Sequence, residues 1–543
     1  MTAAHQADVL PLLALKVGPR QLDVNYRFSF ISIRDQIVRA QMAVKALVDT
    51  GLIEPWRGKP PTDDNFAFQL AIFGAGIAGI AAALQAEEEG IRFVLVEKNR
   101  YPSGILASTA DRYVSTSMYE WPNTTSDSHT YPLDKPVLLD SALWKALRLR
   151  FTKSVTIDTF NRQFKALVAK NVNLWRQNAI MKKSGDWLVE YTTLSEASRK
   201  DLAKTVTSGT DSMISASIDG GDPVALSLDY RPPKKAFRKL SIESDYLLYA
   251  IGYGKEAKTF SDQRIERDLE FDDFWKKDSI PKLALGFPHR PTVLIIGSGD
   301  GALQDALRCL FDPKVPHPLE IWHAAVGTSP VTMGICLASY PPVLTAMRRI
   351  QSYDGYTTSG LIWGNQPTAY RDLDAAFIDI ATQLVSEVGR ELWHNVSPLL
   401  RRDVEWISVI RQDDWFSKAY PLNRFLIYLI MALYRRFKPH APYPGFDVSK
   451  RKVVSIRSHG NRRGGTVTFD DGSVSRHCDA VIYRGGLDRT AEQQVGLSGK
   501  DTGRIELGRI PPPVVPVSST PSRTGTSGLP TAISVVPAST ETA

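Results

Sequence analysis

The chain has 543 residues, of which 43% are hydrophobic and 23% charged, and its formal net charge is +8. This is an ordinary globular composition with room for about three domains, and the mild positive charge suits anionic ligands without demanding nucleic acid. Three cysteines with no C-x-x-C pair argue against a disulfide framework and against a dithiol-based reductase, and they favour a reducing, cytoplasmic compartment.

The first 65 residues are mixed in character. Apolar residues recur at helical spacing over 33–48, so we predict a helix there. Three prolines and a glycine over 55–64 predict a linker. The short apolar run at 9–17 has no basic region before it and no small-residue cleavage site after it, so we expect no signal peptide.

A strand–turn–helix–strand unit is predicted next, over 66–97. The turn carries Gly74-x-Gly76-x-x-Gly79 between an apolar strand at 66–73 and an alanine-rich helix at 77–89. The first glycine permits a tight turn, the second lets the backbone approach a pyrophosphate, and the third lets helix and strand pack closely. The helix N-terminus offers free N–H groups to the phosphates.

Glu97 closes the second strand of this unit, at 93–96. It lies 21 residues past Gly76, about where a carboxylate meets the ribose hydroxyls. Strand, turn, helix and acid together predict nucleotide binding, and the alternative is a Rossmann-like unit that has lost its ligand.

The middle of the chain has weaker signals. Residues 140–175 have a helical pattern, and residues 172–191 alternate as in a β-hairpin, with Trp187 on the return strand. The apolar run at 246–251 predicts a buried strand that enters Gly252.

A second strand–turn–helix unit is predicted from 293 onward. Its turn is Gly297-x-Gly299-x-x-Ala302, in which alanine is a tolerated third residue. We predict the next strand at 319–323, which places His323 or Ala324 opposite the ribose. The pattern predicts a nicotinamide-nucleotide site, and the alternative is a structural Rossmann domain without a cofactor.

The remaining chain is predicted to be helical over 337–440 and to return to strands at 453–456, 467–469 and 480–483. The most apolar stretch, at 425–434, is about half the ~20 residues that a membrane-spanning helix needs. We expect a buried helix there, with a helix resting on a membrane surface as the alternative. Pro, Ser, Thr and Gly dominate from residue 509 on, so we predict a disordered tail.

In this order the motifs resemble the flavoprotein superfamily with two dinucleotide-binding domains, which includes flavin-dependent monooxygenases and thioredoxin-reductase-like enzymes. The resemblance covers roughly 66–505, with 337–440 poorly matched. It is carried by G-A-G-I-A-G at 74–79, V-L-V-E at 94–97, Y-A-I-G at 249–252, I-I-G-S-G-D-G-A at 295–302 and D-A-V-I-Y at 479–483. It implies FAD at Gly74, Ala75, Gly76, Ile77, Gly79, Glu97 and Lys98, and NAD(P)H at Gly297, Gly299 and Ala302.

The implied fold is α/β: a Rossmann-type FAD-binding domain with an inserted NAD(P)-binding Rossmann-type domain and a largely helical segment. We expect an N-terminal helical extension and linker at 1–65, the FAD-binding domain at 66–285 and 451–508, the NAD(P)-binding unit at 286–336, a helical insertion at 337–450 and the tail at 509–543.

The implied function is an FAD-dependent oxidoreductase that uses NAD(P)H, is monooxygenase-like and acts on a small organic substrate. Two alternatives stay open: an FAD-dependent amine or amino-acid oxidase without NAD(P)H, and a non-enzymatic nucleotide-binding or sensor flavoprotein. The flavin carries the chemistry, so no catalytic side chain is named. Dispersed histidines suggest no metal site. We expect no nucleic-acid partner and no transmembrane span, and leave peripheral membrane contact and oligomeric state open.

Overall fold

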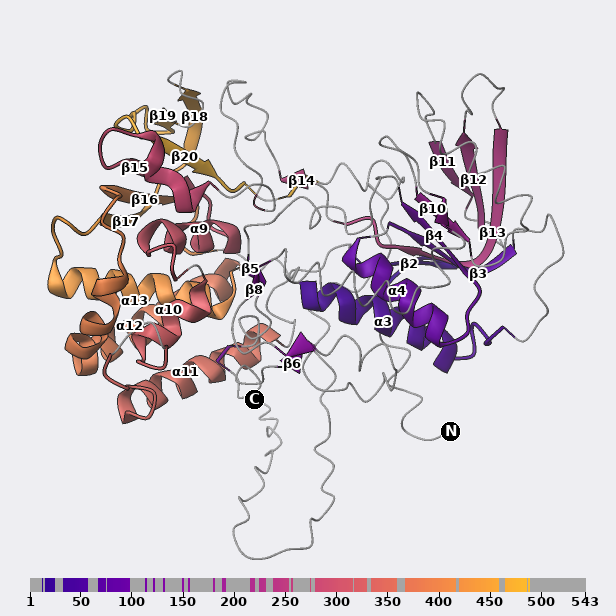
Figure 1. Ribbon diagram of the computed structural model, residues 1–543, viewed down its shortest axis with the longest axis horizontal. Coiled ribbons are helices and arrows are strands. Elements are labelled where there is room, and N and C mark those ends of the chain that lie inside the picture. The colour runs from indigo at the N-terminus through magenta and orange to yellow at the C-terminus, as the bar shows by residue number, and fades with distance from the viewer. Residues whose placement is uncertain are drawn as a thin grey trace, which may run out of the picture.

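The structure is a computed structural model that forms two lobes lying side by side, each with its own sheet (Figure 1). It describes residues 12, 15–24, 33–56, 67–74, 76–97, 113–114, 121–122, 130–131, 149–150, 155–156, 179–180, 188–191, 215–219, 224–230, 238–252, 255–256, 274, 279–315, 317–329, 334–358, 367–416, 419–458, 464–485 and 487–488. The expected helix at 140–175 and the expected tail at 509–543 lie almost entirely outside these residues.

The first lobe contains the predicted strand–turn–helix–strand unit. It consists of β3 (Ala67–Phe73), α4 (Ile77–Glu88) and β4 (Phe93–Glu97). β3 pairs in parallel with β4 on one side and with β13 (Arg238–Tyr249) on the other. The largely apolar sequences of β3 and β4, and of the last four residues of β13, fit a buried parallel sheet. The expected strand that enters Gly252 is thus confirmed as the end of β13.

The N-terminal segment is part of the same lobe. β1 (Lys16–Gly18) pairs with β2 (Gln21–Asp23), and β2 pairs in parallel with β13. The predicted helix at 33–48 is confirmed as α3 (Ile33–Asp49), whose apolar side packs on α4. Because β1 and β2 extend the sheet, residues 16–24 belong to this domain and not to a separate helical extension.

Further strands complete the first sheet along the order β1-β2-β13-β3-β4-β10-β9. The expected hairpin near 172–191 is confirmed where β9 (Ala179–Ile180) and β10 (Leu188–Tyr191) pair in antiparallel fashion. β11 (Ser215–Asp219) and β12 (Val224–Tyr230) form a meander with the first half of β13. Short strand pairs join β5 (Tyr113–Val114) to β8 (Val155–Thr156) and β6 (Thr130–Tyr131) to β7 (Leu149–Arg150).

The second lobe is built on a parallel sheet with the order β17-β16-β15-β20. These are β15 (Thr292–Ile296), β16 (Trp406–Arg411), β17 (Gly445–Lys450) and β20 (Ala480–Tyr483). In chain order they are the first, second, third and fourth strands, so the sheet has the 3-2-1-4 arrangement of a Rossmann fold. The α/β fold class is therefore confirmed in both lobes.

Helices cover one face of the second sheet. α9 (Asp300–Leu310) follows β15, and α13 (Pro421–Phe437) connects β16 to β17. α13 contains the apolar stretch 425–434, and its residues there are buried except for the last few, as expected of a buried helix. Within the described part of the chain, no helix is long and apolar enough to cross a membrane.

The predicted strand at 319–323 is wrong, because these residues lie in α10 (Pro318–Ala325). Pro318 occupies the first helical turn, and His317 caps the helix by accepting a hydrogen bond at Nδ1 from the Leu319 N–H, at 3.2 Å. α10, α11 (Pro341–Thr358), α12 (Pro367–Val396) and the 3₁₀ turn η5 (Ser397–Leu399) all come between α9 and β16.

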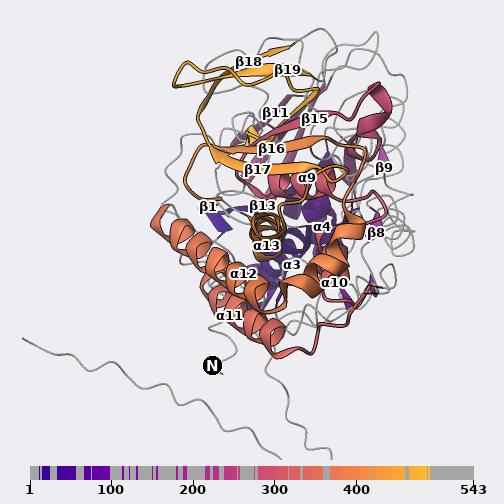
Figure 2. The same ribbon diagram turned by 90° about the vertical axis from the view of Figure 1, so that its left-hand side faces the viewer.

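A hairpin covers the other face of the second sheet. β18 (Val453–Ser458) pairs with β19 (Gly465–Phe469) in antiparallel fashion. Figure 2 shows this hairpin above β16 and β17, with α13 and α12 below them. The contact is an apolar layer made of Leu294, Ile296, Ile410, Val453, Ile456, Val467, Phe469, Val481 and Tyr483.

The expected assignment of 451–508 to the FAD-binding domain is therefore wrong for its described strands. β20 pairs in parallel with β15, and the β18–β19 hairpin packs on that same sheet. The reason is that an apolar strand with a glycine after it fits either sheet, and only pairing with β15 decides between them.

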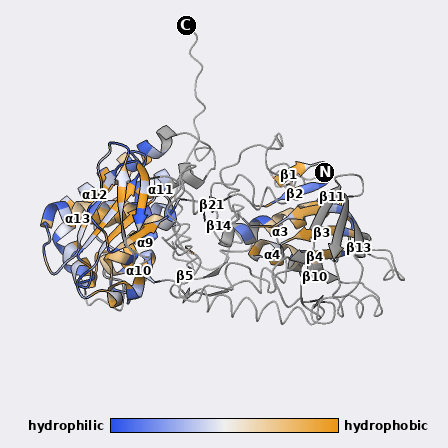
Figure 3. Cartoon of the chain, turned by 90° about the horizontal axis from the view of Figure 1, so that it is seen from above, coloured by the Kyte–Doolittle hydropathy of each residue, from blue (hydrophilic) through white to orange (hydrophobic). Residues whose placement is uncertain are grey.

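Two features join the lobes. β14 (Lys255–Glu256), which follows β13 of the first lobe, pairs with β21 (Leu487–Asp488), which follows β20 of the second lobe. Trp121 is buried in the core of the second lobe, with its ring 5.4 Å from Trp322 and 5.5 Å from Phe425. Figure 3 shows the hydrophobic residues along the inner strands and helices of each lobe.

Candidate nucleotide-binding sites

The first fingerprint lies at the carboxyl edge of the first sheet. Gly74 follows β3, which has parallel neighbours on both sides, and the chain reaches those neighbours by connections in opposite directions. This is a topological switch point, where open α/β sheets bind their ligands. The Ala250 N–H donates to the Phe73 carbonyl at 2.7 Å and brings the end of β13 beside the turn.

The three glycines of the first fingerprint have different surroundings. Gly74 has φ +97°, and a Cβ there would overlap the Ala250 carbonyl oxygen. A Cβ on Gly79 would overlap the Gly74 carbonyl oxygen, so glycine lets α4 lie against the turn. Among the described residues, no atom lies within 4 Å of a Cβ built on Gly76. Gly76 therefore leaves open space at the N-terminus of α4, which fits the approach of a pyrophosphate.

Glu97, the predicted ribose contact of the first site, is the last residue of β4. β4 pairs in parallel with β3, with Val96 opposite Phe73, so Glu97 reaches the same edge as Gly74. Ile77 begins α4 and is partly exposed. Ala75, Lys98 and the side chain of Glu97 are outside the described residues, so their roles stay predictions.

The second fingerprint repeats this geometry in the second lobe. Gly297 has φ +148°, and a Cβ there would lie 2.6 Å from the Arg484 carbonyl oxygen and 3.1 Å from the Ala302 Cβ. Gly299 caps α9, and a Cβ there would meet nothing within 4 Å. The buried Ala302 fills the third position, so this unit also has one open glycine between two packed residues.

β16, and not the predicted strand at 319–323, lies beside β15 in the sheet. β16 pairs with β15 in parallel, and the Gly297 N–H donates to the Ile410 carbonyl at 2.9 Å. Arg411 therefore occupies the end of the second strand, and the expected ribose position at His323 or Ala324 is wrong because both lie in α10. The alternating sequence W-I-S-V-I-R at 406–411 was the signal that could have identified this strand.

Arg411 lies in a compact charged cluster. Its Nη1 is 3.6 Å from Asp374 Oδ2 and 3.4 Å from the Tyr428 hydroxyl, and its guanidinium lies over the Phe416 ring. Asp374 also pairs with the fully buried Arg424 and accepts a hydrogen bond from the Phe416 N–H at 2.7 Å. One carboxylate from α12 thus joins an arginine of β16 to an arginine of α13.

Asp300 was another residue that the sequence reasoning missed. It is the first residue of α9, and its carboxylate accepts hydrogen bonds from the Tyr420 N–H at 3.0 Å, Asn423 Nδ2 at 2.6 Å and Gln304 Nε2 at 2.7 Å. Burial raises the pKa of Asp300, while these hydrogen bonds and the nearby Arg424 act against that rise. The carboxylate ties the N-terminus of α13 to the N-terminus of α9.

A second ion pair fixes the other side of this fingerprint. Arg484 follows β20, and its Nη2 and Nε each lie 2.7 Å from Oδ2 of Asp305, a fully buried residue of α9. The guanidinium also lies over the Phe274 ring. The pair holds α9 against the end of β20, and Gly299 caps α9, so the pair helps to position this open glycine.

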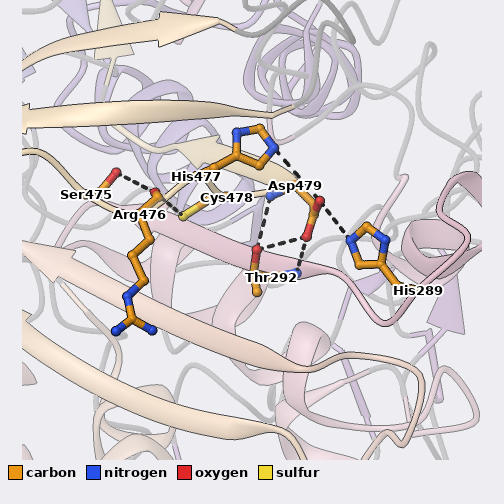
Figure 4. A network of polar contacts seen from close by, with 7 residues as sticks. All are labelled: His289, Thr292, Ser475, Arg476, His477, Cys478 and Asp479. Carbon is orange, nitrogen blue, oxygen red and sulfur yellow. Dashed lines mark hydrogen bonds and ion pairs between the residues drawn. The ribbon is translucent and has the colours of Figure 1, made fainter.

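The acid before β20 has a structural role at the opposite edge of the sheet (Figure 4). Asp479 accepts hydrogen bonds from the Thr292 N–H at 2.8 Å and Oγ1 at 2.9 Å, and His289 Nε2 lies 3.1 Å away. Burial favours a higher pKa for Asp479, but the bonds from Thr292 and His289 hold it below its usual value. This network fixes the register of β15 and β20. Among the described residues, no group of three acidic, His or Cys side chains has a metal-binding arrangement.

Comparisons with solved structures gave weak overall likenesses. The bacillithiol disulfide reductase Bdr (YpdA) from Bacillus cereus is 11% identical with a TM-score of 0.36, over 79% of this chain and 82% of that one. A flavin monooxygenase from Stenotrophomonas maltophilia is 11% identical with a TM-score of 0.32, over 81% and 84%. The lysine monooxygenase NbtG from Nocardia farcinica is 13% identical with a TM-score of 0.30, over 79% and 83%.

Comparison with curated proteins gave no match. The family described as the NAD(P)-binding Rossmann-like domain matches residues 72–132, a segment that starts at the end of β3 and contains the first fingerprint, α4 and β4. In this segment the chain is thus similar, in sequence and in its strand–turn–helix–strand fold, to the NAD(P)-binding Rossmann-like domains.

Proposed function

We propose that this protein is an FAD-dependent oxidoreductase that binds FAD at the first fingerprint and takes electrons from NAD(P)H bound at the second. The observation that carries the proposal is the repeated geometry of the two turns. In each lobe a Rossmann-type strand ends in a glycine turn with one open position, at Gly76 and at Gly299. FAD is assigned to the first turn because the resemblance to the flavoprotein superfamily implies FAD at the first fingerprint and NAD(P)H at the second.

In this proposal, different residues at each site bind the pyrophosphate and the ribose. At the first site, the backbone at Gly76 and the N-terminus of α4 hold the pyrophosphate, and Glu97 meets the ribose. At the second site, Gly299 and the N-terminus of α9 do the same, with Arg411 at the ribose end. Bound FAD supplies hydride acceptance and electron transfer to oxygen or another acceptor.

The connections between the lobes suit this division. The pairing of β14 with β21 and the buried Trp121 bring segments of both lobes together. Electron transfer between two cofactors on separate sheets requires such proximity. We propose a small organic substrate, a monooxygenase-like reaction and a cytoplasmic setting, the last in line with the low cysteine content.

A second candidate is an FAD-dependent oxidase that needs no nicotinamide cofactor. One observation favours it: the carboxylate of Asp300 lies at the N-terminus of α9, where a pyrophosphate would bring further negative charge. The oxidase reading predicts reduction of the flavin by an amine or amino-acid substrate alone.

The test is an absorbance spectrum of the purified chain, followed by anaerobic addition of NADH or NADPH. We expect a flavin spectrum that bleaches with one of the two nucleotides. A Gly299→Val variant should keep the flavin and lose the bleaching, and Gly76→Val should lose the flavin. A colourless protein that FAD cannot reconstitute would disprove the main proposal, and a yellow protein bleached by neither nucleotide would favour the oxidase.

A further inference from the structure

Four charged side chains meet beside the second fingerprint: Asp300 of α9, Asp374 of α12, Arg411 of β16 and Arg424 of α13. Asp374 pairs with both Arg411 and Arg424, and Asp300 lies close enough to Arg424 to interact with it electrostatically. The cluster therefore contains two cations and two carboxylates, so its charges balance without any ligand. Arg424 is fully buried and Asp374 nearly so.

The partners of Asp300 show that it is the ionised form that fits this cluster. Both carboxylate oxygens face N–H donors only: the backbone of Tyr420, the amide of Asn423 and the amide of Gln304. A carboxylate accepts all three bonds with the partners as they stand, whereas a protonated acid would require the Gln304 amide to turn. The N-terminal ends of α9 and α13 both face this charge, and both favour an anion.

The position of Asp300 makes this charge matter for binding. It directly follows Gly299, the open glycine of the fingerprint, at the helix end that receives the pyrophosphate in a Rossmann fold. The site also has unused donor and acceptor capacity. Arg411 Nε, Arg424 Nε and Asn423 Oδ1 are buried and, within the described part of the chain, make no hydrogen bond.

We propose that Asp300 is an affinity-determining residue of the second site: its carboxylate supplies internally the negative charge that a dinucleotide phosphate would otherwise bring. The site then binds NAD(P)H only weakly, because a pyrophosphate at Gly299 adds its charge to a cluster that is already balanced. This inference rests on the proposed function of the second fingerprint as a nicotinamide site. It predicts that removing the charge of Asp300 strengthens binding.

The test compares the wild-type full chain, loaded with flavin, with Asp300→Asn by calorimetric titration with NADP⁺. Asparagine keeps the acceptor oxygen for Tyr420 and Asn423, and Gln304 can turn its amide to pair with the new NH₂ group. We expect NADP⁺ to bind about tenfold more tightly to the variant, with the gain shrinking as salt is raised. A Gln304→Lys variant adds a cation beside the carboxylate and should tighten binding in the same direction, which keeps the test valid if Asp300→Asn folds poorly.

The matched control is Asp471→Asn, which changes the net charge equally in the exposed turn after β19. It should leave NADP⁺ affinity unchanged. Equal affinity of the wild type, Asp300→Asn and Gln304→Lys would overturn the role of Asp300 while leaving a nicotinamide site in place. Failure of all these forms to bind NADP⁺ at millimolar concentration would overturn the nicotinamide site itself, and the inference with it. Binding by the Asp300→Asn variant alone would support the inference most strongly.

Discussion

The first fingerprint offers a matched pair of substitutions that separates binding from folding. Gly76 and Gly79 lie one helical turn apart, at the start of α4. A side chain at Gly76 enters open space, whereas even a methyl group at Gly79 overlaps the Gly74 carbonyl oxygen. We therefore expect Gly76→Val to impair flavin binding alone and Gly79→Ala to impair the fold.

The magnitudes follow from these surroundings. A Cβ at Gly76 meets no atom of the described residues within 4 Å, so we expect Gly76→Val to change the free energy of unfolding of the flavin-free protein by less than about 0.5 kcal/mol. The valine occupies the space through which the pyrophosphate approaches, and we expect at least about a hundredfold loss of FAD affinity, or roughly 3 kcal/mol. Gly79→Ala forces α4 away from the turn, and overpacking of this kind costs about 1–3 kcal/mol or more.

Two measurements on each variant test this reasoning. The ratio of flavin to protein absorbance after gel filtration reports FAD retention, and urea denaturation of the flavin-free forms reports stability. The reasoning is refuted if Gly76→Val retains flavin like the wild type. It is also refuted if Gly79→Ala leaves the urea midpoint unchanged, because the packing of α4 on the turn would then not require glycine.

Two further predictions concern the second lobe. Replacing the buried Trp121 with alanine leaves a cavity against Trp322 and Phe425 and should cost about 3–5 kcal/mol in urea unfolding; an unchanged midpoint would show that this ring does not join the lobes. Asp479→Asn should cost about 1–3 kcal/mol at neutral pH, because the bonds from Thr292 stabilise the carboxylate. The pKa of Asp479 is lowered by folding, so its contribution is complete above the unfolded pKa near 3.8 and is lost as pH falls further. Unfolding curves of wild type and variant should therefore converge in acid, and a gap that is constant from pH 7 to pH 3 would contradict this assignment.

Local patterns were sufficient wherever neighbouring residues determine the structure. The turn Gly74-x-Gly76-x-x-Gly79 and its flanking strand and helix follow from backbone sterics and apolar spacing over a few residues. The helix α3 and the buried helix α13 were predicted for the same reason. The second turn at Gly297 could likewise be placed, because it has the same local form.

Pairing between distant segments could not be predicted in this way. β16, the strand beside β15, comes about a hundred residues later, after four α-helices, and a shorter apolar run at 319–323 was the nearer candidate. That run is a helix because Pro318 and His317 start one and the surrounding core buries it. As a result, Arg411 was not recognised as the last residue of the strand beside β15.

By itself, the sequence determined that the chain carries two Rossmann-type turns and which residues build them. Only the tertiary structure decided that β20 belongs to the second sheet and that Asp300 meets Arg424 beside the open Gly299. The physical reason is that turn geometry depends on residues adjacent in the chain. Strand pairing and the balance of buried charges depend on residues that can lie more than a hundred positions apart in the chain.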